Sequence, residues 1–368
     1  MSSVSSGAAH LARLGARGRP AGSMAAAAAR AYCADVLQGL GFTVREHPFE
    51  FSALPGELGA PLAGVMVPLL ATALWGVRNA GPAWWIAGAI VLVAAALVGR
   101  HLAWRGVLDL GVMRRRGVNL EAVRGGRIDQ PAIWLVAHLD SKWQPVPMLG
   151  RVAGVILMAV GGLGLVLEAV AHANSPWPLV LMWIGGIPLM ASFVGVRNDG
   201  ALDNASGVAT VLEAAELVAR EPRSDVGVLI TDAEELALAG ARAWTRWRGR
   251  PAGGVAFNCD SIDDAGSLTV MYSRGLPGDL VASLRRAALD CGERPRVMRL
   301  LPGVLTDGVA LTHAGWRAVT LSRGTLRTLG RIHTSDDTLA SMRGTGIANA
   351  ARVLAGAIHD MNHALERH

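Results

Sequence analysis

The chain carries little charge for its length. Charged residues make up only 17% of its 368 residues, whereas a typical soluble domain carries about 25%. Hydrophobic residues make up 51%, and the mean hydropathy is +0.35. This imbalance argues against a wholly soluble chain and indicates that apolar segments have been added to a globular protein.

Lysine is nearly absent. The formal net charge is +6, yet Lys142 is the only lysine and every other basic side chain apart from histidine is arginine. The pattern expected of a nucleic-acid surface, a basic helix with interleaved aromatic residues, has no match longer than the seven residues RAWTRWR at 242–248. We therefore expect no nucleic-acid partner.

Cysteine is also scarce. The three cysteines, Cys33, Cys259 and Cys291, form no CxxC pair and are odd in number, which argues against a disulfide framework and fits a reducing compartment. The first thirty residues contain no apolar run followed by a small-residue cleavage site, so we expect no signal peptide.

Long apolar runs are what the sequence has in place of charge. Residues 58–77 and 83–99 contain no charged side chain, and residues 152–167 and 177–196 form a second such pair. These lengths approach that of a membrane span, and arginine and tryptophan flank the runs as at membrane interfaces. We interpret 58–105 and 149–197 as two inserted transmembrane hairpins. The alternative for the first is a helical hairpin buried in a large core, and the second could instead lie against the membrane or cap the active site.

Loop charges predict an orientation. Arginines cluster after the first hairpin, at 100, 105 and 114–116, and Arg151 and Arg197 flank the second, whereas the hairpin turns carry only Arg78. Positively charged loops remain on the cytoplasmic side. The sequence therefore predicts a multi-pass membrane protein with its catalytic domain in the cytoplasm.

The rest of the chain alternates predicted strands and helices. Residues 24–40 are expected to form a helix and 42–51 a strand, and short apolar runs such as IWLVAH, VGVLIT and GGVAFNC alternate with amphipathic helices up to 341–365. Such alternation predicts an α/β fold with a mixed, mainly parallel sheet sandwiched by helices. We assign 23–57, 106–148 and 198–368 to this domain, after a mobile N-terminus at 1–22.

Acids and imidazoles follow the apolar strands. The strand IWLVAH ends in His138 and is followed by Asp140. Glu234 and Glu235 follow VGVLIT, and Asp260 follows GGVAFNC. Asp203 precedes a helix, and His333 lies near the C-terminus. Ligands bind beyond the carboxyl ends of parallel strands, so we expect these groups to converge. Converging carboxylates repel one another unless a cation lies between them, and two histidines with several carboxylates suit Zn²⁺.

Each residue alone has an ordinary structural explanation. His138 could be a hydrogen-bonded structural histidine, and Asp203 could be a helix N-cap. Glu234–Glu235 could be a solvated turn, and His333 could be a surface residue. The metal interpretation rests on their joint occurrence at strand ends.

The motifs HLDS, GALDNASG, DAEE, NCDS and IHTSDDT occur in this order, and together they resemble metallopeptidase family 28, the co-catalytic zinc aminopeptidases and glutamate carboxypeptidases. The run from Gly18 to Val44 resembles the family's opening helix and strand, and GVNLEAVRGG its next strand. The resemblance implies a three-layer, phosphorylase-like zinc-exopeptidase fold. It also implies a membrane-bound exopeptidase, most simply an aminopeptidase, acting through two zinc ions per chain and an activated water.

The resemblance also implies residue roles. His138 and Asp260 would bind one metal, Glu235 and His333 the other, and Asp203 would bridge both. Glu234 would be the catalytic base. Asp140 would orient His138 without touching metal, and Asp337 would support the His333 loop.

The sequence departs from the family between His138 and Asp203, where about sixty residues containing the second apolar pair replace a short loop. We therefore expect a peptide substrate that is apolar or membrane-associated and a metal site near the membrane surface. HLDSK, with Lys142, also resembles glutaminyl cyclases, which use a single zinc for acyl transfer. A third interpretation is a catalytically inert membrane scaffold. The sequence does not predict the oligomeric state.

Overall fold

The computed structural model describes residues 5–76, 105–124, 131–171, 173–221, 225–249, 254–300 and 304–366, with scattered positions between 86 and 104. The chain divides into two compact units. We call residues 1–50, 115–143 and 196–368 the sheet unit, and residues 51–114 and 144–195 the helical unit. Each is described by itself.

The sheet unit is built on eight strands in the order β1-β2-β4-β3-β5-β8-β6-β7. Their bounds are β1 Thr43–Ser52, β2 Arg114–Arg124, β3 Ile133–His138, β4 Val226–Thr231, β5 Val255–Ile262, β6 Ser267–Tyr272, β7 Arg296–Arg299 and β8 Arg317–Gly324. The central strands β4, β3, β5 and β8 run parallel, while β2 and β6 are antiparallel to their central neighbours. The predicted mixed, mainly parallel sheet is confirmed.

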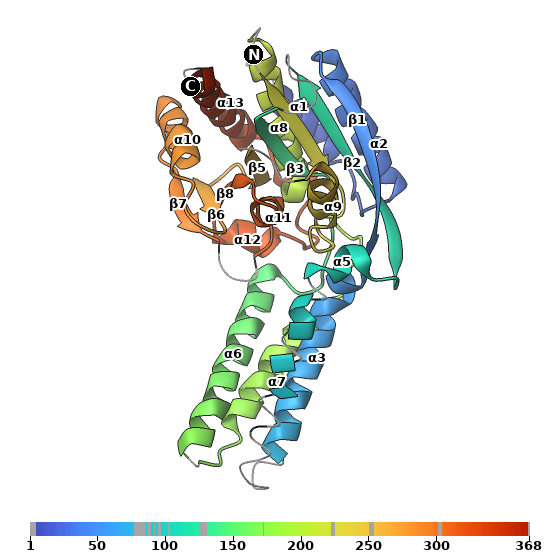
Figure 1. The fold of residues 1–368 in the computed structure, drawn as a ribbon, viewed down its shortest axis with the longest axis vertical. Helices are drawn as coiled ribbons and strands as arrows, with labels where there is room; N and C mark the ends of the chain where they lie inside the picture. Colours follow the sequence, from blue (N-terminus) through green and yellow to red (C-terminus); the bar gives the residue numbers. More distant parts are fainter. Residues whose placement is uncertain are drawn as a thin grey trace. The chain divides into compact units, whose positions relative to one another are not determined.

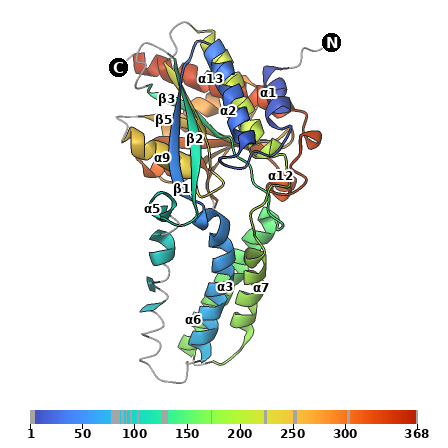
Figure 2. The same cartoon turned by 90° about the vertical axis from the view of Figure 1, so that its right-hand side faces the viewer.

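Helices cover both faces of this sheet. They are α1 Ser6–Leu14, α2 Met24–Gly39, α8 Ser206–Ala219, α9 Ala239–Arg248, α10 Gly278–Asp290, α11 Asp307–His313, α12 Leu326–Arg331 and α13 Thr345–Glu366. Helix α13 packs on α8 and α10, while α9 packs on α11. Figure 2 shows α2 and α13 on one side of the sheet and α9 on the other. Every residue of β3 and β4 is buried, as expected of strands covered on both faces.

The N-terminal segment was expected to be mobile over residues 1–22; its first four residues lie outside the described part of the chain, and the rest differs from the expectation. From Ser6 to Leu14 it forms helix α1, which the Ser5 side chain caps by accepting a hydrogen bond from Ala8 N. His10 lies 3.0 Å from Glu216 Oε1 on α8, and Leu11 and Leu14 are buried. The segment therefore belongs to the packed sheet unit.

The helical unit consists of α3 Leu54–Gly76, α6 Met148–Ala171, α7 Trp177–Met190 and the short α5 Gly106–Asp109. Within it, α7 packs against both α3 and α6, as Figure 1 shows. Glycines permit this approach: a Cβ atom on Gly154 would lie 2.6 Å from Gly185 O, and one on Gly64 would lie 2.7 Å from Gly186 O. Small residues at such crossings are typical of helix packing in membranes.

Three of the four predicted apolar runs fall on these helices. Among the described residues, α3 and α6 are long and apolar enough to cross a membrane, by length and composition only. The run predicted over 177–196 ends as a helix at Met190, with Pro188 in its last turn. The run over 83–99 lies largely outside the described residues.

Candidate metal centre

The expected site residues reach one place from separate elements of the sheet unit. His138 is the last residue of β3, and Asp260 lies near the end of the adjacent parallel strand β5. Glu234 and Glu235 lie in the turn after β4, Asp203 lies in the irregular turn Ala201–Ala205 before α8, and His333 lies in the loop after α12. Because β3 and β5 are parallel, their carboxyl ends bring His138 and Asp260 to the same edge of the sheet.

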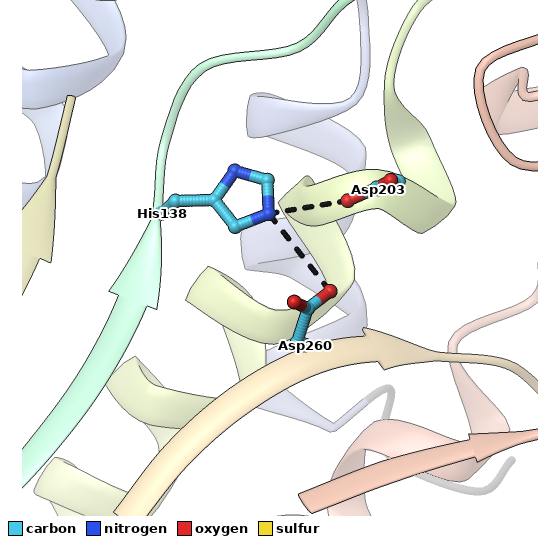
Figure 3. A group of neighbouring side chains, drawn as sticks. All are labelled: His138, Asp203 and Asp260. Atoms are coloured by element: carbon cyan, nitrogen blue, oxygen red, sulfur yellow. Dashed lines mark ion pairs between the residues drawn. The ribbon is translucent and has the colours of Figure 1, made fainter. Parts of the chain in front are cut away.

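One cluster contains His138, Asp203 and Asp260. His138 Nε2 lies 3.1 Å from Asp203 Oδ1 and 3.8 Å from Asp260 Oδ1, and Figure 3 shows both carboxylates directed at the same imidazole nitrogen. One donor atom of each residue lies within 4.8 Å of the others. This is one imidazole and two carboxylates around a common point.

A second cluster shares Asp203. His333 Nε2 lies 3.0 Å from Asp203 Oδ2 and 2.9 Å from Glu235 Oε1, and the three donor atoms also lie within 4.8 Å of one another. Asp203 therefore offers Oδ1 to one cluster and Oδ2 to the other. A carboxylate used in this way can bridge two cations.

Glu234 lies beside the first cluster, with Oε2 3.9 Å from His138 Nε2. Burial raises its pKa well above the ordinary value; the charge of His138 opposes this shift and the charge of Glu235 adds to it. A glutamate that holds a proton readily in a buried site is suited to accept and return protons.

The two imidazoles lie in a strongly negative electrostatic field. Burial alone would lower the pKa of His138, but the neighbouring Glu234, Asp140 and Asp203 raise it well above its usual value. For His333, burial again acts downwards, and Glu235 raises the pKa. The surrounding carboxylates thus favour positive charge on both imidazoles. A cation would perform the same role, so the donor set fits a metal.

Asp140 supports both the imidazole and the acidic turn. Its carboxylate accepts hydrogen bonds from Glu234 N at 3.0 Å and Glu235 N at 3.2 Å. His138 Nδ1 lies 3.1 Å from the Asp140 carbonyl oxygen and 3.6 Å from carboxylate Oδ1. Asp140 therefore fixes the ring of His138 and the turn that carries Glu234 without facing either cluster.

Asp337 supports a different ligand from the one expected. Its carboxylate accepts hydrogen bonds from Leu202 N at 2.6 Å and Asp203 N at 3.2 Å, so its side chain holds the Asp203 turn. Burial raises the pKa of Asp337 to about 7, and the charge of Asp203 adds to this shift.

Arg19 is a residue that the sequence reasoning missed. Its guanidinium is 1% exposed and donates to the backbone carbonyls of Leu139, Leu14, Arg17, Asp199 and Gly200. Arg19 N also donates to Ser141 Oγ at 2.9 Å. The side chain therefore links the loop after His138 to the turn before Asp203. Its only sequence signal was GRPAGS, which lies in the segment expected to be mobile.

Comparison with known proteins gives a family and a fold. A sequence model described as "Peptidase family M28" matches residues 119–358, whereas no curated protein matches the chain. The aminopeptidase from Aneurinibacillus sp. strain AM-1 superposes with a TM-score of 0.59 at 14% identity, covering 96% of this chain and 93% of its own. BSAP, a zinc aminopeptidase from Bacillus subtilis, gives a TM-score of 0.57 at 15% identity over 97% and 94%. Porphyromonas gingivalis glutaminyl cyclase gives 0.57 at 15% over 97% of each chain, so the fold is shared by both enzyme classes.

Proposed function

The chain belongs to peptidase family M28, and we propose that it is a zinc-dependent exopeptidase, an aminopeptidase, that hydrolyses the terminal peptide bond of a peptide. The observation that carries the proposal is the position of Asp203 between the two histidines. Its two oxygens lie 3.1 Å from His138 Nε2 and 3.0 Å from His333 Nε2. A carboxylate between two imidazoles in this way supports a site for two zinc ions.

The ligands would be divided as the clusters divide them. His138 and Asp260 would hold one zinc ion, Glu235 and His333 the other, and Asp203 both. Zinc ions bound in this way would polarise the scissile carbonyl and lower the pKa of water to near neutrality.

The chain's own groups would move the proton. Glu234, beside the first cluster, would accept a proton from the attacking water and return it to the leaving amine. Asp140 would keep Glu234 in reach through the backbone of the acidic turn. Groups that orient a base or a ligand in this way commonly affect activity nearly as much as the ligands themselves.

We further propose that the helical unit anchors the enzyme in a bilayer. In their most apolar stretches, α3 and α6 are only 22% and 17% buried, unlike core helices of a soluble domain. Their outward side chains are large and apolar, including Met66, Ile156 and Leu163. The arginine distribution supports several spans with the catalytic unit in the cytoplasm.

A bilayer anchor would favour substrates that the bilayer concentrates. We therefore propose an apolar or membrane-associated peptide as the substrate. Equal cleavage of polar soluble peptides and hydrophobic ones by the purified enzyme would exclude this part of the proposal.

Glutaminyl cyclization is the second candidate, and Lys142 directly after the HLDS motif favours it. Such enzymes also share the fold. A cyclase would convert an N-terminal glutamine to pyroglutamate with the loss of ammonia and would need a single zinc ion.

The test measures metal and activity on the same detergent-purified samples. Wild type is compared with Asp203→Ala and with a control, Asp336→Asn, whose exposed side chain lies in the loop after His333. We expect about two zinc ions per chain and release of N-terminal residues for wild type and control, and neither for Asp203→Ala. One zinc with pyroglutamate formation would establish the cyclase. Neither metal nor hydrolysis would leave an inert membrane scaffold.

A further inference from the structure

The only lysine of the chain lies in the candidate metal centre. Lysine and arginine together number 35, and Lys142 is the single position where arginine was not used. Its side chain is 15% exposed. A lysine ammonium is a compact point charge, whereas the guanidinium of arginine is a broad planar fork that binds carboxylates through two donors. Position 142 therefore carries a charge that can contact a single carboxylate oxygen.

Lys142 makes this single-oxygen contact with Glu235. Its Nζ lies 2.7 Å from Glu235 Oε2, while the other oxygen, Oε1, lies 2.9 Å from His333 Nε2. The two oxygens of Glu235 are thus divided between an ammonium and the second cluster. Burial would raise the pKa of Glu235, but His333 and Lys142 lower it to about 2.

The backbone of Lys142 is held in place. Its carbonyl accepts a hydrogen bond from Asn198 Nδ2 at 2.8 Å, and the ring of the next residue, Trp143, lies 4.9 Å from the guanidinium carbon of Arg197. These contacts fix the start of the Lys142 side chain, so its ion pair with Glu235 does not depend on a free loop.

The two clusters differ in this respect. Glu235 of the second cluster forms an ion pair with Lys142, whereas among the ion pairs of the described residues Asp260 of the first cluster is paired only with His138. A positive charge beside a ligand carboxylate repels a metal ion. It also occupies one of the two oxygens with which that carboxylate could bind the metal. A metal ion at the second cluster would face this repulsion, and one at the first cluster would not.

We propose that Lys142 makes the two metal positions unequal, so that zinc binds tightly at His138, Asp203 and Asp260 and more weakly at Asp203, Glu235 and His333. The inference rests on the proposed two-metal function. Its consequence is regulatory, because the chain passes between a one-metal and a two-metal form as the zinc concentration changes. Lys142 acts here as a positioning residue for Glu235.

The first test is a calorimetric zinc titration of the metal-free full chain in detergent, with chelator competition for the tight step. Wild type is compared with Lys142→Met, which removes the charge at similar length, and with Lys142→Arg, which retains it. We expect two separate steps in wild type. In the Met variant the second dissociation constant should fall at least tenfold, with the first constant changed less than threefold. The Arg variant should keep the second step weak.

Equal steps in wild type would overturn the inference while leaving two-metal hydrolysis intact. An unchanged or weaker second step in the Met variant would overturn it as well. If the chain binds no zinc at all, the proposed function itself is refuted. Far-ultraviolet circular dichroism checks that each variant is folded, and Lys142→Gln replaces Lys142→Met if the latter does not fold.

The single lysine also allows a direct spectroscopic readout. Reductive methylation with ¹³C-formaldehyde preserves the positive charge and labels Lys142 together with the N-terminal amine, and Lys142→Arg identifies which resonance belongs to the lysine. We expect the Lys142 signal to stay in place during addition of the first zinc equivalent and to shift during the second. A shift completed by the first equivalent would contradict the assignment of Lys142 to the weaker position.

Discussion

Replacing Arg19 with methionine should destabilise the sheet unit and weaken its metal site. The buried guanidinium donates to five backbone carbonyls that belong to α1, to the segment after α1, to the loop after His138 and to the turn before Asp203. Methionine has a similar length but donates no hydrogen bond, so these carbonyls would lose a shared partner inside the protein.

The magnitude follows from two opposing effects. A buried carbonyl without a partner costs about 1–3 kcal/mol. Gly200 O keeps a hydrogen bond from Ala205 N, so the other four carbonyls, at the lower part of this range, cost about 6 kcal/mol. Burial also lowers the pKa of Arg19 to about 10, which shows that burying the charge is itself unfavourable, by about 3 kcal/mol. Removing the charge recovers that part. We expect a net loss of about 3 kcal/mol in the free energy of unfolding.

Urea unfolding of the metal-free protein, followed by tryptophan fluorescence, measures the loss, and a zinc titration measures the metal affinity. Arg17→Met is the matched control, because Arg17 is two residues away and its side chain is exposed. A loss below about 1 kcal/mol in the free energy of unfolding for Arg19→Met, or an equal loss in the control, would refute the view that Arg19 joins the loop after His138 to the turn before Asp203.

Three further predictions concern the base, a buried carboxyl and the helical unit. Glu234→Gln should lower kcat by at least about a hundredfold with an unchanged zinc content by mass spectrometry; loss of zinc would contradict its role as a base. Burial raises the pKa of Asp232 to about 7, so its protonated form is favoured in the folded state, and this carboxyl makes the free energy of unfolding fall as pH rises from about 4 to about 7, by up to about 1.4 kcal/mol per pH unit. Urea unfolding of metal-free Asp232→Asn at pH 5 and pH 7 should show a smaller fall than wild type, and an identical fall would be evidence against it. Gly161→Ala would place a Cβ atom 2.5 Å from Pro178 O and should lower the thermal midpoint in detergent by an amount equivalent to about 1–3 kcal/mol, whereas Gly162→Ala, with no neighbour within 4 Å, should not.

The sequence predicted those parts of the fold that follow local patterns. The apolar run of β3 and the helix after Asp203 were expected from composition and periodicity alone. Helix α9 was missed because its sequence, AGARAWTRWR, has few apolar residues, and the burial of its Trp244 depends on packing against Trp134 of β3 and Trp316 before β8. Helix α7 ends at Met190, whereas the apolar run on which the prediction rested continues to residue 196.

The site was predictable to a similar degree. Four of the five residues of the two clusters stand next to a recognisable strand or helix, so their position at the sheet edge could be inferred, whereas His333 was assigned to the site only through the family resemblance. The role of Arg19 could not, because most of its acceptors are backbone carbonyls more than a hundred residues away in sequence. A carbonyl acceptor leaves no trace in residue type, and only the folded chain brings it to the guanidinium.

The order of the ligands along the chain affects synthesis. The clusters draw on residues from His138 to His333 of a 368-residue chain, and β3 gains its neighbours β4 and β5 only after the α6–α7 segment has been made. Because chains are made from the N-terminus and domains fold as units, a nascent chain lacks a complete second cluster until His333 has been translated. Incomplete chains would therefore be unable to cleave peptides at the ribosome, and premature termination before His333 would release an inactive product.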